Sequence, residues 1–195
     1  MTSPSLTSEE REFLLTLARE TIERAVRVPN HDVQLIIESP PTERLSEPGA
    51  SFVTLHTTGG TLRGCIGSLI ARRPLVDDVH ANALGAAFHD PRFPPIMPTE
   101  LANIVIEVSV LSQPKPLDYN GPKQLMDKLR PHVDGVVLRK NMHRATFLPQ
   151  VWEQLPSAES FLSHLCQKAG LPPNAWQAGD LEILTYQVEE FEESG

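Results

Sequence analysis

The chain has 195 residues, 40% of them hydrophobic, and a formal net charge of −8. This length and apolar fraction exclude a disordered chain and suit one domain with its own core, or two lobes that share one. The acidic balance disfavours nucleic-acid binding, because the phosphate backbone repels an acidic protein that lacks a concentrated basic patch. The densest basic spots, at residues 72–73 and 140–144, have no interleaved aromatic residues.

The two cysteines, Cys65 and Cys166, are too few for a disulfide framework, which favours a reducing compartment. The first residues lack the basic start and the apolar segment of a signal peptide. No apolar run approaches the ~20 residues that a membrane span needs. We therefore expect a cytoplasmic protein with no membrane partner.

The first half of the chain predicts a helix, a strand hairpin, a second helix and another strand. Thr7 and Glu10 have the spacing of a capping box at the start of the first helix. Glycines in the turn at residues 58–61 occupy the two positions that favour positive φ. The expected elements are a helix over 7–27, strands over 51–57 and 62–69, a helix over 75–88, a proline-stiffened loop over 90–98 and a central strand over 104–111.

The second half predicts shorter elements of the same kinds. They are helices over 121–129 and 157–169, a hairpin of 135–139 with 144–148, a helical segment over 149–155 and a final strand over 181–191. Hairpins interrupted by helices indicate an α+β fold with a mainly antiparallel sheet and flanking helices. With no evident linker, the expected organisation is a single domain over residues 1–195.

The segment around Cys65 is the strongest candidate for a functional site. Two glycines, Gly64 and Gly67, lie close to it in a strand, where glycine needs a reason such as a bulge or the close approach of a ligand or another backbone. On a regular strand, Arg63 shares a face with Cys65 and would favour the reactive thiolate. The alternative interpretation is that Cys65 is a small buried hydrophobic residue between packing glycines.

The loop DPRFPP at residues 90–95 is the second candidate. Asp90 and Arg92 have the spacing of a local ion pair, and the prolines would hold that pair rigidly at the edge of a cleft. The alternative is a rigid crossover whose Phe93 fills the core.

Other side chains give weaker signals. His56 lies on the strand before the hairpin, where it is a candidate general base for Cys65. Glu107 interrupts an apolar strand and is either a carboxylate facing a cleft or a residue on a solvent face. Cys166 shares an apolar helix face, which favours packing. The chain lacks C-x-x-C and H-x-x-x-H spacing, so no metal or other cofactor is expected.

Residues 62–67 and 90–95 resemble the LRGCIG and DPRFPP motifs of the AMMECR family. Later blocks of that family are similar to residues 106–111, 148–151 and 168–171, in the same order. The resemblance covers nearly the whole chain and implies a two-lobed α+β fold. For a prokaryotic source it also implies the role of protein A of an AmmeMemoRadiSam system, with a Memo-like protein and a radical SAM protein as partners.

Two functions remain open from the sequence. In the first, the chain is a binding or accessory component that holds a small molecule or a peptide with Arg63, Gly64, Cys65, Gly67, Asp90 and Arg92. In the second, it is an enzyme that uses Cys65 as a nucleophile. The sequence gives no complete set of nucleophile, base and orienting group, which favours the binding role.

Overall fold

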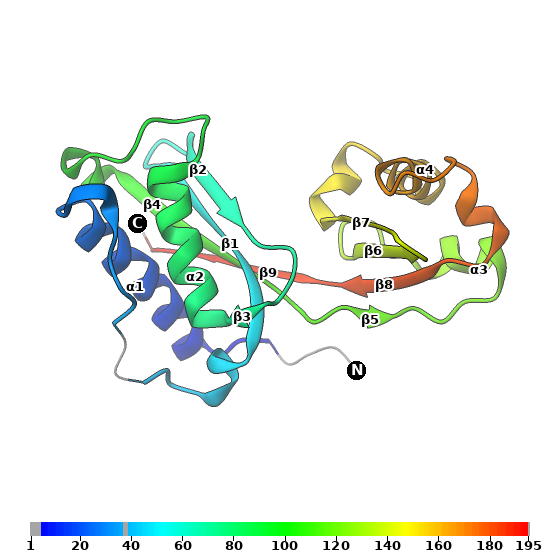
Figure 1. The fold of residues 1–195 in the computed structure, drawn as a ribbon, viewed down its shortest axis with the longest axis horizontal. Coiled ribbons are helices and arrows are strands. Elements are labelled where there is room, and N and C mark those ends of the chain that lie inside the picture. Colours follow the sequence, from blue (N-terminus) through cyan, green and yellow to red (C-terminus); the bar gives the residue numbers. More distant parts are fainter. Residues whose placement is uncertain (1–4, 37–38, 195) are drawn as a thin grey trace. The chain divides into compact units, whose positions relative to one another are not determined.

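The computed structural model describes residues 5–36 and 39–194. The chain divides into two compact units (Figure 1). Unit 1 contains the chain up to Leu111 and the segment from Glu189 onward, and unit 2 contains Ser112–Val188.

The sheet of unit 1 carries the predicted hairpin. Its strand order is β2-β1-β4-β9, and the short β3 also pairs with β1. Antiparallel pairing sets Thr54 of β1 opposite Cys65 on one side and Glu107 on the other. This confirms that Cys65 lies on a hairpin whose sheet also contains β4. The bounds are β1 Pro48–Thr57, β2 Leu62–Gly67, β3 Arg73–Pro74, β4 Ile104–Leu111 and β9 Val188–Glu192.

Two helices pack beside each other in unit 1, as Figure 1 shows: α1 (Ser8–Ala25) and α2 (Leu75–Leu84). The capping box of Thr7 and Glu10 forms as predicted. The apolar stripe of α1 joins the core with Leu14, Leu17 and Ile22 buried, whereas Phe13 is only partly buried. Shorter turns lie at Pro29–His31, Glu43–Ser46 and Pro98–Asn103.

Unit 2 has its own antiparallel sheet and its own core. The strand order is β5-β8-β6-β7. Trp152 stacks on Phe161 with ring centroids 3.8 Å apart, and both rings are fully buried. The bounds are β5 Lys115–Pro116, α3 Gly121–Lys128, β6 Gly135–Lys140, β7 His143–Phe147, α4 Ala158–Lys168 and β8 Glu182–Tyr186, with 3-10 turns at Pro149–Glu153 and Ala175–Ala178. The α+β fold with antiparallel sheets and flanking helices is therefore confirmed.

Three local predictions need correction. The final strand is two strands, because the extended chain leaves the sheet of unit 2 after β8 and enters that of unit 1 as β9 without a turn residue between them. The second helix ends at Leu84 and continues as a π-helical turn at Gly85–His89. In the hairpin turn, Gly60 alone adopts positive φ (80°).

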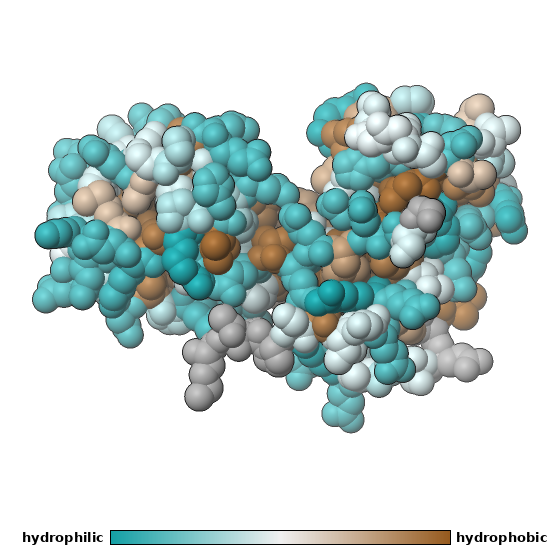
Figure 2. Space-filling model, turned by 180° about the vertical axis from the view of Figure 1, so that it is seen from behind, coloured by the Kyte–Doolittle hydropathy of each residue, from teal (hydrophilic) through white to brown (hydrophobic). Residues whose placement is uncertain are grey.

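No helix among residues 5–36 and 39–194 is long and apolar enough to cross a bilayer. The face of the molecule in Figure 2 is mostly hydrophilic, with hydrophobic residues in small scattered groups.

Leu17→Ala should lower the free energy of unfolding by about 2–5 kcal/mol, because it opens a cavity between α1 and the core. Chemical denaturation measures this loss. The exposed Glu20 of the same helix is the matched control, and Glu20→Ala should change stability by less than about 0.5 kcal/mol. A similarly small loss for Leu17→Ala would contradict the core assignment.

Candidate functional site

Cys65 lies on the edge strand of the unit 1 sheet, and its side chain is partly exposed. The neighbouring strand supplies its nearest polar partner, because the Thr54 hydroxyl donates a hydrogen bond to the sulfur over 3.4 Å. Cys65 is therefore partly exposed and its thiol is hydrogen-bonded, unlike a cysteine that only fills the core.

Asp90 and Arg92 bind the outward-facing backbone of Cys65. The Cys65 N–H donates to Asp90 Oδ2 (2.9 Å), and Arg92 Nη2 donates to the Cys65 carbonyl (3.3 Å). The Arg92 guanidinium also forms two hydrogen bonds with the Asp90 carboxylate, of 2.9 and 2.7 Å. The predicted Asp90–Arg92 ion pair is confirmed, and it takes the place of a further strand at the edge beside Cys65.

The electrostatics of this pair follow from its hydrogen bonds. Asp90 is 4% exposed, and the hydrogen bonds from Arg92 hold its pKa well below the usual range against the opposing effect of burial. The pKa of Arg92 is raised, chiefly by Asp90 and to a smaller extent by Cys65. Phe93, which is partly buried, lies under the guanidinium at 5.5 Å from ring centroid to Cζ. The cation next to Cys65 is therefore Arg92.

Arg63 has a different partner from the one expected. A bulge shifts the register between Leu55 and His56, so the strand is not regular at Arg63 and the expected alternation with Cys65 does not apply. The Arg63 guanidinium forms hydrogen bonds with Glu100 (2.8 and 3.1 Å) and with the Pro94 carbonyl (2.9 Å). Arg63 thus anchors the loop that carries Asp90 and Arg92.

The two glycines of the motif make room for the protein's own atoms. A Cβ on Gly64 would lie 2.2 Å from the carbonyl oxygen of Ala86 in the π-helical turn. A Cβ on Gly67 would lie 2.1 Å from the ring of Phe52. Of the interpretations left open by the sequence, close packing of backbone and ring explains these glycines without a ligand.

A polar row crosses three strands of the same sheet. Cys65, Thr54 and Glu107 are neighbours in register, on the face opposite the apolar side chains that pack against the helices. His56 Nε2 lies 3.9 Å from Glu107 Oε2. Burial raises the pKa of Glu107, nearby Glu190 adds to the rise, and His56 opposes it. His56 is therefore paired with Glu107 and not directly with the thiol.

Cys166 takes no part in this arrangement. Cys166 is fully buried in unit 2, where burial raises the pKa of its thiol. Within the described ranges, no three His, Cys, Asp or Glu side chains gather in a way that would hold a metal ion.

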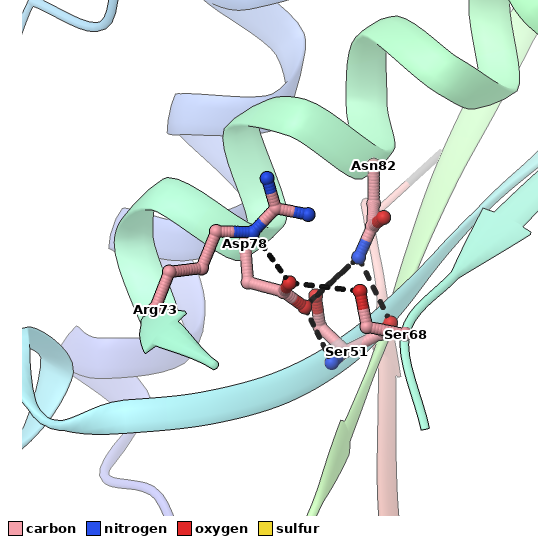
Figure 3. A network of polar contacts seen from close by, with 5 residues as sticks. All are labelled: Ser51, Ser68, Arg73, Asp78 and Asn82. Carbon is pink, nitrogen blue, oxygen red and sulfur yellow. Dashed lines mark hydrogen bonds and ion pairs between the residues drawn. The ribbon is translucent and has the colours of Figure 1, made fainter. Parts of the chain in front are cut away.

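Sequence reasoning missed a second polar cluster, centred on the buried carboxylate of Asp78 (Figure 3). Oδ2 accepts hydrogen bonds from the Ser51 N–H and hydroxyl and from the Asn82 amide, at 2.8–2.9 Å. Oδ1 accepts from the Ser68 hydroxyl (2.8 Å) and from Arg73 Nε (2.9 Å). Two signals were available in the sequence. Asp78 and Asn82 are one helical turn apart, and Asp78 lies where the apolar face of α2 was expected.

Gly64→Ala should lower the free energy of unfolding by about 1–3 kcal/mol or more, because the added Cβ meets a backbone carbonyl that cannot rotate away. Gly59→Ala is the matched control, since its Cβ would meet nothing closer than 3.8 Å. Urea denaturation of both variants checks this, and equal stability of the two would contradict the packing role of Gly64.

Asp90→Asn should lower the free energy of unfolding by about 1–3 kcal/mol at neutral pH, because the variant loses charged hydrogen bonds. The pKa of Asp90 is lowered on folding, so its contribution is complete above the unfolded pKa of ~3.9 and is lost as the pH falls toward the folded value. Denaturation from pH 7 down to pH 3 should show the two proteins converging. Asp118→Asn, at an exposed position, is the control, and a pH-independent difference for Asp90→Asn would contradict this assignment.

Comparisons with known proteins agree on one family. The AMMECR1 family profile matches residues 15–191. Protein MK0488 of Methanopyrus kandleri is 42% identical, with 96% of this chain and 90% of that protein covered. Protein MJ0810 of Methanocaldococcus jannaschii is 38% identical, with 96% and 92% covered.

A solved structure agrees with the sequence matches. The uncharacterized protein PH0010 of Pyrococcus horikoshii has a TM-score of 0.74 and 35% sequence identity, over 97% of this chain and 94% of that one. The family resemblance noted from the two motifs is thereby confirmed over both units. The chain belongs to the AMMECR1 family.

Proposed function

We propose that this protein is a binding or accessory component of an AmmeMemoRadiSam-type system. In this proposal it acts with a Memo-like protein and a radical SAM protein, and it holds a small-molecule or peptide ligand at the Cys65 edge. The observation that carries the proposal is the guanidinium of Arg92, which the buried Asp90 holds beside Cys65 on a side chain that is 54% exposed. The partner classes come from the family resemblance.

The geometry supports binding because the site is held rigid before any ligand arrives. Asp90 and the backbone of Cys65 fix Arg92, and Arg63 fixes the loop through Glu100 and the Pro94 carbonyl. A fixed donor loses little conformational freedom when a ligand binds, which favours affinity. Arg92 Nη1 has no partner in the described part of the chain, so it remains able to donate to a carbonyl or carboxylate of the ligand.

The alternative, a cysteine-dependent enzyme, also has support. An accessible thiol beside a cation is the usual setting of a reactive cysteine, and the His56–Glu107 pair lies on the adjoining strands. In this alternative Cys65 is the nucleophile, and the His56–Glu107 pair is the candidate base on the same face of the sheet, although it is not bonded to the sulfur. Binding remains the better-supported function, because the hydrogen bond to the sulfur comes from Thr54, a donor and not a base.

Cys65 should react with iodoacetamide in the folded protein much faster than Cys166, which becomes accessible only on unfolding. Mass spectrometry of the peptides gives both rates. Arg92→Met should slow the reaction of Cys65 several-fold, because the attacking species is the thiolate anion and the variant leaves the neighbouring Asp90 carboxylate without its cation. Arg27→Met, which removes another exposed charge of unit 1, should not. A slower reaction in Arg27→Met than in Arg92→Met would contradict the geometry.

The Cys65→Ala variant distinguishes the binding function from the enzymatic alternative. If the protein is a binding component, the variant should still co-purify with the Memo-like and radical SAM proteins of the same organism. An enzyme would instead lose its turnover in Cys65→Ser while keeping its fold. If the unmodified chain retains neither the Memo-like protein nor the radical SAM protein, the proposal is wrong.

A further inference from the structure

A hollow of about 610 Å³ follows the end of β2 in unit 1 and is distinct from the Cys65–Arg92 contacts. The loop between β2 and α2 forms most of its wall. Its principal lining residues are Ser68, Leu69, Ile70, Arg72 and Arg73, with the buried Asp78 at its base.

Asp78 holds this loop at both of its ends. Its Oδ1 accepts one hydrogen bond from Ser68, at the start of the loop, and another from Arg73, at its end (Figure 3). Its Oδ2 is held in turn by Ser51 and Asn82. The hollow therefore has a fixed frame and does not have to be assembled when a partner arrives.

The wall combines exposed aliphatic side chains with an unbalanced positive charge. Leu69 and Ile70 are each 39% exposed, whereas most aliphatic side chains of unit 1 are buried. Arg73 is neutralised by Asp78. The neighbouring Arg72 is exposed and forms no hydrogen bond or ion pair with any residue the structure describes. The surface thus offers an apolar contact next to a free guanidinium.

We propose that this hollow docks an acidic peptide segment of a partner protein, one that places an aliphatic side chain against Leu69 and Ile70 and a carboxylate against Arg72. Charge complementarity selects this occupant, since Arg72 is the cation left without a partner. A nucleic acid or an anionic membrane needs several cations, and unit 1 has nine Lys and Arg against eighteen Asp and Glu. This inference rests on the proposed function, because the docking protein would be a partner of that system.

The test is the fluorescence anisotropy of a labelled peptide of alternating leucine and glutamate, titrated with the full chain. We expect saturable binding that weakens as salt is added. Arg72→Glu and Ile70→Ser should each weaken it by about tenfold or more, as expected for the charged and apolar anchors of one small interface. Circular dichroism and thermal unfolding should show both variants folded, because both changes lie on an exposed loop.

Matched controls make the result specific to the hollow. Arg27→Glu reverses another exposed charge of unit 1, and Met142→Ser removes a 96% exposed apolar side chain from unit 2; neither should change binding. Peptides with lysine in place of glutamate, or serine in place of leucine, should bind at least about tenfold more weakly. Absence of binding, equal binding of the lysine peptide, or unchanged binding in Arg72→Glu would overturn the inference.

A failure of this inference can be told apart from a failure of the proposed function. Co-purification of the Memo-like and radical SAM proteins tests that function, whereas the peptide titration tests the hollow alone. If the partners are retained equally by the unmodified chain and by Arg72→Glu, and peptide binding does not depend on Arg72, the docking surface is wrong and the proposed function stands.

Discussion

The carboxylate of Asp90 is the interaction on which the Cys65 site depends. It joins a backbone N–H of the edge strand to an arginine two residues further along its own loop. A buried carboxylate is costly unless its oxygens are hydrogen-bonded, and Asp90 meets that requirement with Cys65 and Arg92 as partners. The need to satisfy one buried charge therefore fixes the loop, the guanidinium and the thiol relative to one another.

The same contacts protect the edge of the sheet. An edge strand presents unpaired backbone groups that invite pairing with another chain. On β2, the N–H and carbonyl of Cys65 are bound by Asp90 and Arg92. On the helix side, the Ala86 carbonyl reaches Gly64 too closely for any side chain. The glycines of the motif thus serve the packing around Cys65, which in the proposed function leaves ligand contact to the side chains of Arg92 and of the polar row.

Much of unit 1 was predictable from local pattern, whereas the partners of its charged residues were not. The hairpin follows from two alternating runs around a glycine turn, and the Asp90–Arg92 pair follows from its spacing. The partner of Arg63 was mispredicted, because a bulge adds one residue to β2 at this point and cancels the expected alternation; the neighbouring glycine allowed a bulge but did not place it. The link from Asp90 to Cys65 spans 25 positions and depends on where the loop packs. The split between β8 and β9 also escaped prediction, since an extended chain can change sheets without a turn.

Arg92 and Arg72 suit different kinds of binding, although both lie near β2. Arg92 is already paired with a buried carboxylate, so it offers a ligand directed N–H groups but little net charge. Arg72 has no such partner in the described structure, and its field acts on any acidic group that approaches the hollow. Recognition at Cys65 should therefore depend on the shape and hydrogen bonding of the ligand, and docking at the hollow on charge. If both proposals hold, this separation lets one unit hold a specific ligand and a partner protein without either competing for the same arginine.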